Sequence, residues 1–310
     1  MERDWIDFLC NSKTLQCPDE LLIGIGDDTA MLAPFPRQAN TFLTTDMLTE
    51  GVDFLLCKHS PEQIGRKALA VNLSDLAAMA AEPFGVLVSV ALPRSRSPFD
   101  LAKRLYAGMK PLLEHYNVTL LGGDTNTWDG GLVISITAIG RLDGNRQPFR
   151  RSGGKIDDHI LVTGSLGGSL LQHQFTFEPK ISEAIVLSSF NINAAIDISD
   201  GLLLDLSRLA NASELGAEIN LEAIPISDDA HKMSKTSGKT PLEHALSDGE
   251  DFELLLATDE KTAAKLMEKQ PLIEKFNTPI TDIGKLTEQK GLRATDQNGT
   301  REIEPRGYEH

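Results

Sequence analysis

The stretch Lys67-Ala-Leu-Ala-Val-Asn-Leu-Ser-Asp-Leu-Ala-Ala-Met79 carries the strongest fold signal in this 310-residue chain. Positions 64, 68, 71, 75 and 79 step by four, three, four and four residues, which is the spacing of one helical face. That face carries Asp75 among the apolar residues Ile64, Ala68, Val71 and Met79. The spacing therefore predicts a helix over residues 61–81 with one carboxylate on an apolar stripe.

Asp75 needs an explanation, because a carboxylate on an apolar stripe is costly to bury unless a cation or hydrogen-bond donors compensate it. Lys67 and Asn72 lie within two turns and could supply an ion pair or a capping network. A bound metal ion is the second explanation. Asp75 alone leaves both explanations open.

On either side of this helix, β-rich runs alternate with helical patterns, which predicts an α/β (α+β) fold. The first half has expected strands at 21–25, 41–45, 84–92 and 132–139, with a second helix at 99–115. After a polar stretch at 141–154, strands are expected at 160–163, 194–198, 217–221 and 252–257, with helices at 201–210 and 260–269. We predict two domains, 1–147 and 148–310.

Composition narrows the class of protein. Hydrophobic residues make up 41% and aromatic residues 5% of the chain, as in a globular protein, and no apolar run approaches a spanning helix. Thirty basic against forty-five acidic residues give a net charge of −15, which disfavours nucleic acid as a partner. The three cysteines show no paired spacing and are expected to be reduced thiols. The sequence predicts a cytoplasmic protein without a membrane partner.

Five segments share one layout, in which an apolar run ends in Gly, Ser or Thr and then Asp. The segments are Ile23-Gly-Ile-Gly-Asp27-Asp28, Phe42-Leu-Thr-Thr45-Asp46, Val71-Asn72-Leu-Ser74-Asp75, Leu120-Leu-Gly122-Gly123-Asp124 and Ile196-Asp197-Ile-Ser199-Asp200-Gly201. This layout predicts carboxylates at strand ends, where α/β sheets place their ligand sites. Each segment has a structural explanation too: Asp200 as a helix N-cap, Asp27-Asp28 as a turn and residues 122–125 as a hairpin loop.

Taken together, the five segments favour a metal-assisted phosphate site. Oxygen ligands without His or Cys suit Mg²⁺ or Ca²⁺, and no EF-hand loop is present in the sequence. Gly122-Gly123 would let backbone N–H groups approach a phosphate closely. A Walker A loop is excluded, because Met233 stands where its first glycine would precede Gly238-Lys239-Thr240. We therefore expect Mg²⁺ ions that bridge the acidic chain to a nucleotide.

Several stretches of the sequence closely resemble the thiamine-monophosphate kinase family of the aminoimidazole-ribonucleotide-synthetase-like superfamily. They are Gly24-Ile-Gly-Asp-Asp-Thr-Ala-Met-Leu32, the helical stretch 67–79, Leu121-Gly-Gly-Asp-Thr125, Arg151-Ser-Gly-Gly, Asp197-Ile-Ser-Asp-Gly-Leu202 and Ser247-Asp-Gly-Glu-Asp-Phe-Glu253. The resemblance covers nearly the whole chain. It implies a homodimer whose N-terminal sheets join, a C-terminal α/β domain, and an active site in the cleft between the domains.

The resemblance also implies roles for individual residues. Metal positions match Asp28, Thr45, Asp46, Asp75, Asp124, Asp197 and Asp200, of which Asp75, Asp124 and Asp200 carry the catalysis. ATP contacts match Gly123, Asp124, Arg151 and Ser199, and a substrate contact matches Glu250. Two family substrate contacts differ: Asp53 replaces a His, and Pro305 replaces a Trp. Asp53 and Tyr308 are therefore expected on the substrate side, with Tyr308 in the stacking role.

The implied reaction transfers the γ-phosphoryl group of ATP to thiamine monophosphate, assisted by several Mg²⁺ ions, and gives thiamine diphosphate. Other superfamily members lack support: the lysine-containing loop of aminoimidazole-ribonucleotide synthetase, the reactive Cys-Lys of selenophosphate synthetase and the C-terminal cysteine of the hydrogenase-maturation dehydratase are all missing. Two alternatives remain. One is an ATP-using enzyme with a different phosphorylated acceptor. The other is a non-catalytic protein that binds nucleotide or divalent metal.

Overall fold

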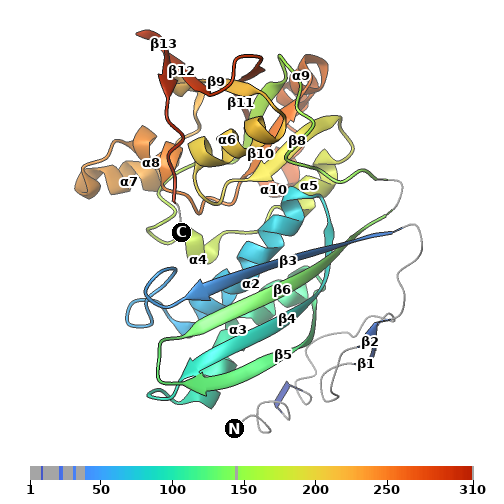
Figure 1. The fold of residues 1–310 in the computed structure, drawn as a ribbon, viewed down its shortest axis with the longest axis vertical. Coiled ribbons are helices and arrows are strands. Elements are labelled where there is room, and N and C mark those ends of the chain that lie inside the picture. Colours follow the sequence, from blue (N-terminus) through green and yellow to red (C-terminus); the bar gives the residue numbers. More distant parts are fainter. Residues whose placement is uncertain (1–7, 10–20, 24–30, 33–38, 144–145, 309–310) are drawn as a thin grey trace. The chain divides into compact units, whose positions relative to one another are not determined.

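A computed structural model of the chain describes residues 8–9, 21–23, 31–32, 39–143 and 146–308 (Figure 1). Contacts between Cα atoms divide the chain into two compact units, which are described separately below. Unit 1 comprises Met1–Leu76 and Ala81–Arg146, and unit 2 comprises Ala77–Ala80 and Gln147–His310. Asp28 lies outside the described residues. None of the described helices is long and apolar enough to cross a lipid bilayer.

Unit 1 is built on a four-stranded sheet with the order β3-β6-β4-β5. Its strands are β3 (Asn40–Thr49), β4 (Glu82–Pro93), β5 (Thr119–Trp128) and β6 (Val133–Leu142). The helices α2 (Pro61–Ala78) and α3 (Pro98–His115) lie together on one face of this sheet (Figure 1). The short strands β1 (Leu21–Ile23) and β2 (Met31–Leu32) form a separate antiparallel pair. Only the β4–β5 pair of the larger sheet is parallel.

The helix α2 confirms the predicted helix, but its buried face is broader than the predicted stripe. Ile64 and Ala68 are fully buried, and so are Lys67 and Asn72, which the pattern placed elsewhere. Val71 and Asp75 are only half-buried. The predicted stripe is therefore buried at Ile64 and Ala68 but not at Val71 and Asp75. A helix that is covered on most sides is apolar all round, so its apolar spacing does not single out one face.

The other face of the unit 1 sheet exposes large apolar side chains. In β3, alternate residues point to opposite faces, and Leu43 and Met47 are 71% and 65% exposed. Leu87 on β4 is 38% exposed, and it pairs with Thr137 of β6. We call this surface the open face; it carries Leu43, Met47, Leu87 and their neighbours on the same side of the sheet.

Unit 2 contains a seven-stranded sheet with the order β13-β12-β9-β11-β7-β10-β8, in which β9 and β12 form its parallel pair. The strands are β7 (His159–Thr163), β8 (Ile192–Asp197), β9 (Gly216–Asn220), β10 (Leu254–Thr258), β11 (Ile280–Thr287), β12 (Leu292–Asp296) and β13 (Gly299–Ile303). The helices are α4 (His173–Thr176), α5 (Ile181–Leu187), α6 (Leu202–Ala212), α7 (Asp228–Ser237), α8 (Pro241–Ser247), α9 (Glu260–Lys269) and α10 (Ile273–Phe276), with a 3₁₀ turn η1 (Leu221–Ala223). Apolar residues of β7, β8 and β10 pack against α6 and form the core.

The predicted fold class is confirmed as a two-part mixed α/β architecture. Every predicted strand and helix overlaps an observed one where the structure describes it. The strands β2, β5, β11, β12 and β13 lie outside the predicted strands. The alternative explanation of residues 122–125 as a hairpin loop is wrong, because these residues lie inside β5.

Candidate functional site

In unit 1, β3 and α2 bring two acidic side chains to the edge of the sheet. The Thr44 hydroxyl donates a short hydrogen bond to Asp75 Oδ2. Two residues further along β3, the Asp46 backbone N–H donates to Asn72 Oδ1 at 3.2 Å. Asn72 is itself held by its Nδ2 group, which donates to the Ala68 carbonyl of α2 at 3.0 Å. Asp46 and Asp75 therefore belong to one polar cluster between strand and helix.

Thr45 lies outside this cluster. Its hydroxyl donates to the Ile136 carbonyl at 3.1 Å and accepts a hydrogen bond from Thr137 Oγ1 at 3.1 Å, on the open face. The residue that sequence reasoning missed is Thr44. Strand alternation places Thr44 and Asp46 on the same side and Thr45 on the other. Strand alternation could therefore have identified Thr44 as a neighbour of α2, but only with knowledge of which side of β3 faces the helix.

Asp124 and Gly123 lie in the middle of β5, at the opposite edge of the sheet from β3. Asp124 is in register with Ser89, which places it on the open face, and its Oδ1 accepts the Thr125 N–H at 2.9 Å. Three strand spacings, roughly 14 Å, separate β5 from β3. A single chain therefore does not bring Asp124 to Asp46 and Asp75.

Gly123 has a structural role of its own. Its φ is +156°, and a Cβ at this position would lie 1.8 Å from the Val88 carbonyl oxygen. The backbones of β4 and β5 thus require glycine here whether or not a phosphate binds.

Asp53, predicted on the substrate side, is part of a tight turn after β3. Its Oδ2 accepts the Thr49 N–H at 2.6 Å. Its carbonyl oxygen accepts Nζ of the buried Lys67 at 3.1 Å. The structure therefore gives Asp53 a local turn-forming role.

In unit 2, the segment after β8 gathers four of the predicted residues. Asp197 is the last residue of β8, and Ser199 and Asp200 follow it. The Glu250 N–H donates to the Ser199 carbonyl at 2.7 Å, and the Tyr308 N–H donates to the Asp200 carbonyl at 2.8 Å. Ser199, Asp200, Glu250 and Tyr308 are thus neighbours, although 109 residues of sequence separate Ser199 from Tyr308.

The expected placement of carboxylates at strand ends is confirmed for Asp197 and wrong for three others. Asp46 and Asp124 lie within strands, and Asp75 lies within α2. Asp124 continues its strand because polar residues are tolerated on the open face of a sheet. Asp46 continues its strand on the helix-facing side, where its N–H donates to Asn72 of α2.

Asp200 takes part in an ion-pair network that sequence reasoning missed. Arg208 Nη1 forms a short ion pair with Asp200 and lies 2.7 Å from Asp205 Oδ1. Asp205 Oδ2 accepts the N–H groups of Asp200 and Gly201 at 2.9 and 3.1 Å. Burial raises the pKa of Asp205 to about 6. The N-cap of α6 is Gly201, so the N-cap explanation of Asp200 is wrong.

Arg151 is exposed and lies along β8, away from its carboxyl end. The Ala195 N–H donates to the Arg150 carbonyl at 2.7 Å, next to Arg151 in the chain. Ala195 precedes Ser199 by four residues, roughly 13 Å of extended chain. The structure does not bring Arg151 to the Ser199 segment.

Two further acids, Asp251 and Glu253, are buried beside this segment. Glu253 contacts Lys180 Nζ at 3.1 Å and accepts the Thr163 hydroxyl at 2.6 Å. Burial, partly offset by Lys180, raises the pKa of Glu253 to about 7. Burial also raises the pKa of Asp251, whose Oδ1 accepts the Gly167 N–H at 2.8 Å. Its buried Oδ2 has no hydrogen-bond partner among the residues that the structure describes.

We expect Glu253 to make stability rise as pH falls from 8 to 6. Its pKa is about 7 in the folded chain against 4.5 ordinarily, so the folded state binds the proton more tightly. The stability gained on protonation is lost again as pH rises through 7, and it amounts to about 1 kcal/mol between pH 8 and 6. Thermal melts should show a Tm about 2 °C higher at pH 6. Glu253→Gln should reduce this difference, whereas the exposed control Glu302→Gln should preserve it. A full pH dependence in Glu253→Gln would contradict the assignment.

Metal chemistry can be judged from the donors alone. Among the described residues, no three His, Cys, Asp or Glu side chains come together as a metal site. Mg²⁺, however, is commonly held by one or two carboxylates together with substrate phosphates and water. Unit 1 offers two carboxylates, because Asp46 and Asp75 belong to one polar cluster. Unit 2 offers two more, because Asp200 follows three residues after Asp197 at the end of β8. The all-oxygen donor set therefore fits Mg²⁺.

A cavity of about 550 Å³ opens in unit 2, and neither Asp197 nor Asp200 lines it. It is lined by residues of β9, β11, β12 and nearby loops: Asp157, Glu218, Ile219, Asn220, Glu222, Gly284, Lys285, Thr287, Thr295, Asp296 and Gln297. It contains none of the predicted site residues. Hydrogen bonds around Ser199, and not the size of a cavity, therefore define the candidate site in unit 2.

Comparison with known families matches both halves of the chain. The N-terminal domain of AIR synthase related proteins matches residues 26–142, and the C-terminal domain of the same proteins matches residues 155–297. A thiamine-monophosphate kinase of Rhodopirellula baltica is 39% identical over 318 aligned residues, which cover 100% of this chain and 97% of that protein.

Solved structures give the same result. A thiamine-monophosphate kinase from Stenotrophomonas maltophilia is 30% identical with a TM-score of 0.79, and the match covers 94% of each chain. A structure described as AaThiL complexed with AMPPCP and TMP is 29% identical with a TM-score of 0.77, and the match covers 100% of this chain and 96% of that one.

Proposed function

This chain belongs to the thiamine-monophosphate kinase family, and from that premise we propose the reaction that it catalyses. It transfers the γ-phosphoryl group of ATP to thiamine monophosphate and so produces thiamine diphosphate and ADP. The observation that carries this conclusion is the full-length match to a structure that holds AMPPCP and TMP together. The junction of Ser199, Asp200, Glu250 and Tyr308 in unit 2 supports it.

We propose that Mg²⁺ assists this reaction. Asp46 and Asp75 would hold it in unit 1, and Asp197 and Asp200 would hold it in unit 2. Asp28 is a further proposed ligand, on the basis of the sequence alone. When bound, Mg²⁺ neutralises the charge of the phosphates and of the transition state. Arg208 shares the Asp200 carboxylate, so this side chain is already oriented by an ion pair before metal binds.

The chain's other residues position the two substrates. Ser199 would contact ATP and Glu250 the thiamine phosphate, and their backbones are joined by a hydrogen bond of 2.7 Å. Phosphoryl transfer needs alignment and charge neutralisation more than covalent chemistry. A general base is not needed, because the accepting phosphate oxygen is anionic at neutral pH. Arg151 and Tyr308 remain proposed contacts to ATP and to the substrate ring.

We also propose that the protein is a homodimer joined through the open face. Leu43 and Met47 are exposed there, as a buried interface core would require. Asp124 stands on the same face and cannot reach Asp75 within one chain. A second copy would cover the apolar residues and give Asp124 new neighbours. We further propose residues 1–147 and 148–310 as the two domains and the cytoplasm as the location.

We expect Leu43→Asp and Met47→Asp to convert the dimer into a monomer. A charge on each protomer at this face would have to be buried without a partner, which strongly disfavours association. Light scattering coupled to size exclusion should report about half the mass of the wild type. The matched control is Leu170→Asp, since Leu170 is 48% exposed in unit 2. A wild type that is monomeric, or open-face variants that remain dimeric, would refute the interface.

The function is tested by measuring ADP release and thiamine diphosphate together. Purified protein with ATP, Mg²⁺ and thiamine monophosphate should form both products in equal amounts. ADP release with a different phosphorylated acceptor at a much higher rate would overturn the substrate. No ADP release with any acceptor, but tight ATP binding, would favour the non-catalytic alternative.

A further inference from the structure

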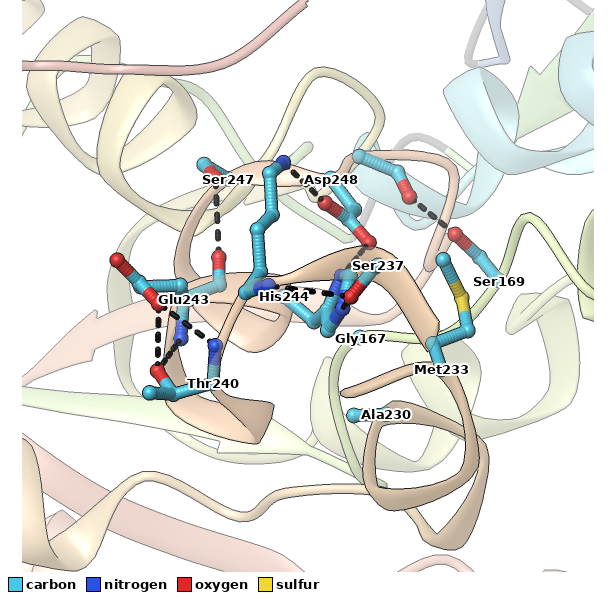
Figure 2. A network of polar contacts seen from close by, with 12 residues as sticks. Gly167, Ser169, Ala230, Met233, Ser237, Thr240, Glu243, His244, Ser247 and Asp248 are labelled. Carbon is cyan, nitrogen blue, oxygen red and sulfur yellow. Dashed lines mark hydrogen bonds and ion pairs between the residues drawn. The ribbon is translucent and has the colours of Figure 1, made fainter. Parts of the chain in front are cut away.

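A chain of three polar side chains links α7 to the loop that carries Glu250. His244 Nδ1 lies 2.5 Å from Asp248 Oδ2, and His244 Nε2 lies 2.7 Å from Ser237 Oγ (Figure 2). Lys239 Nζ lies 3.0 Å from the other carboxylate oxygen of Asp248. The side chains of His244 and Asp248 are each 2% exposed, so the centre of this polar network is buried and satisfied, while Ser237 at its outer end is exposed.

The loop after Asp248 has an unusual backbone. Gly249, Glu250 and Phe252 have φ angles of +75°, +57° and +52°. Residues other than glycine rarely adopt this left-handed conformation, and it persists only where the surroundings impose it. Glu250, the proposed substrate contact, therefore depends on its neighbours for its orientation.

The surroundings hold this loop from both ends. On the far side, the Phe252 N–H donates to the Ile198 carbonyl at 2.8 Å, and the Ile198 N–H donates to the Glu253 carbonyl at 2.8 Å. On the near side, the Gly249 carbonyl accepts the Ser169 hydroxyl. Asp248, which begins the loop, is held by His244 and Lys239. Glu250 lies between these two anchors and donates its N–H to Ser199.

We propose that His244 is a positioning residue for the phosphate acceptor: through Asp248 it fixes the left-handed turn that presents Glu250 to thiamine monophosphate. This inference rests on the proposed function, in which Glu250 contacts that substrate. Ser237 holds the imidazole from the other side, and Lys239 shares the Asp248 carboxylate. His244 is not needed to begin α8, because a capping box between Thr240 and Glu243 stabilises the N-terminus of that helix.

The test compares a variant in the middle of α8 with a variant at the N-cap of the same helix. His244→Ala removes the buried one of the two partners of Asp248 and should raise the KM for thiamine monophosphate about tenfold. The KM for ATP should stay within twofold, because the two bonds of Ile198 still hold the Ser199 segment. His244→Asn, whose amide can replace Nδ1 as a donor to Asp248, should restore the KM to within about threefold of the wild type.

Thr240→Ala is the matched control, since it weakens the capping box at the start of α8 and leaves His244 in place. It should lower the Tm without changing the KM for thiamine monophosphate. Equal KM effects in Thr240→Ala and His244→Ala would show that His244 merely stabilises the helix, and would overturn the proposal. If His244→Ala does not fold, Ser237→Ala, at an exposed position, should still raise this KM about threefold.

Failure of the inference can be told from failure of the function. If the wild type forms thiamine diphosphate but the folded variants keep its KM, only the positioning role is wrong. If the wild type forms no thiamine diphosphate at all, the proposed function is wrong, and the role of His244 toward this acceptor is wrong with it.

Discussion

Asp75→Asn is expected to lower turnover of thiamine monophosphate at least about a hundredfold while the protein stays folded. Asparagine has nearly the same shape as aspartate and can still accept the hydrogen bond from Thr44, which preserves the junction of β3 and α2. It lacks the negative charge that would hold Mg²⁺ against the phosphates. Because the two side chains are nearly equal in size, the substitution creates no cavity and adds no bulk at this half-buried position.

Steady-state kinetics and thermal melts check this expectation together. The control is Asp100→Asn, which neutralises an acid of unit 1 that is exposed in the first turn of α3. Asp100→Asn should keep wild-type turnover. If Asp75→Asn turned over normally and only melted earlier, Asp75 would be a structural residue that holds Thr44.

Removal of metal is expected to abolish ATP binding. The chain has a net charge of −15, and the acids proposed for the site add local negative charge where the phosphates would lie. Without a divalent cation, this field repels the triphosphate, so the loss of affinity should reach about a hundredfold or more. Isothermal titration with ATP in excess EDTA should show no measurable heat of binding.

Addition of Mg²⁺ in excess over EDTA should restore binding in the same sample. This reversal separates loss of the metal from damage to the protein. ATP affinity in EDTA equal to that in Mg²⁺ would be incompatible with a site built on carboxylates, and would leave basic side chains as the ATP contacts.

The positions of site residues were predicted best from the sequence where the local pattern and the packing agree. The strand β8 is an apolar run that ends at Asp197, and the turn into α6 follows it, so the placement of Asp197 and Asp200 at a strand end was predictable. The helix α2 was predictable in extent but not in orientation, because it is buried on most sides. Its spacing alone could not show that Asp75 lies on the more accessible side.

Other parts of the site depend on contacts that no local pattern encodes. The strand β5 contains Gly122-Gly123-Asp124, which is typical of a loop, and it becomes a strand because β4 pairs with it along its length. Arg208 reaches Asp200 only after α6 forms and places it two turns away. Thr44 contacts Asp75 across 31 residues of sequence, so its role follows from the packing of β3 on α2.

The left-handed turn at Gly249, Glu250 and Phe252 also bears on the engineering of a more heat-resistant enzyme. Glycine at position 250 would relieve about 1 kcal/mol of backbone strain, so a search guided by stability alone would favour Glu250→Gly. Glycine at 250 would, however, delete the carboxylate. Phe252 is a different case, because its buried ring stacks on Phe177 at 4.1 Å and contributes more stability than its backbone strain costs. Heat resistance and the proposed catalysis therefore make opposite demands at position 250, and selection for activity would account for the strained Glu250 that remains there.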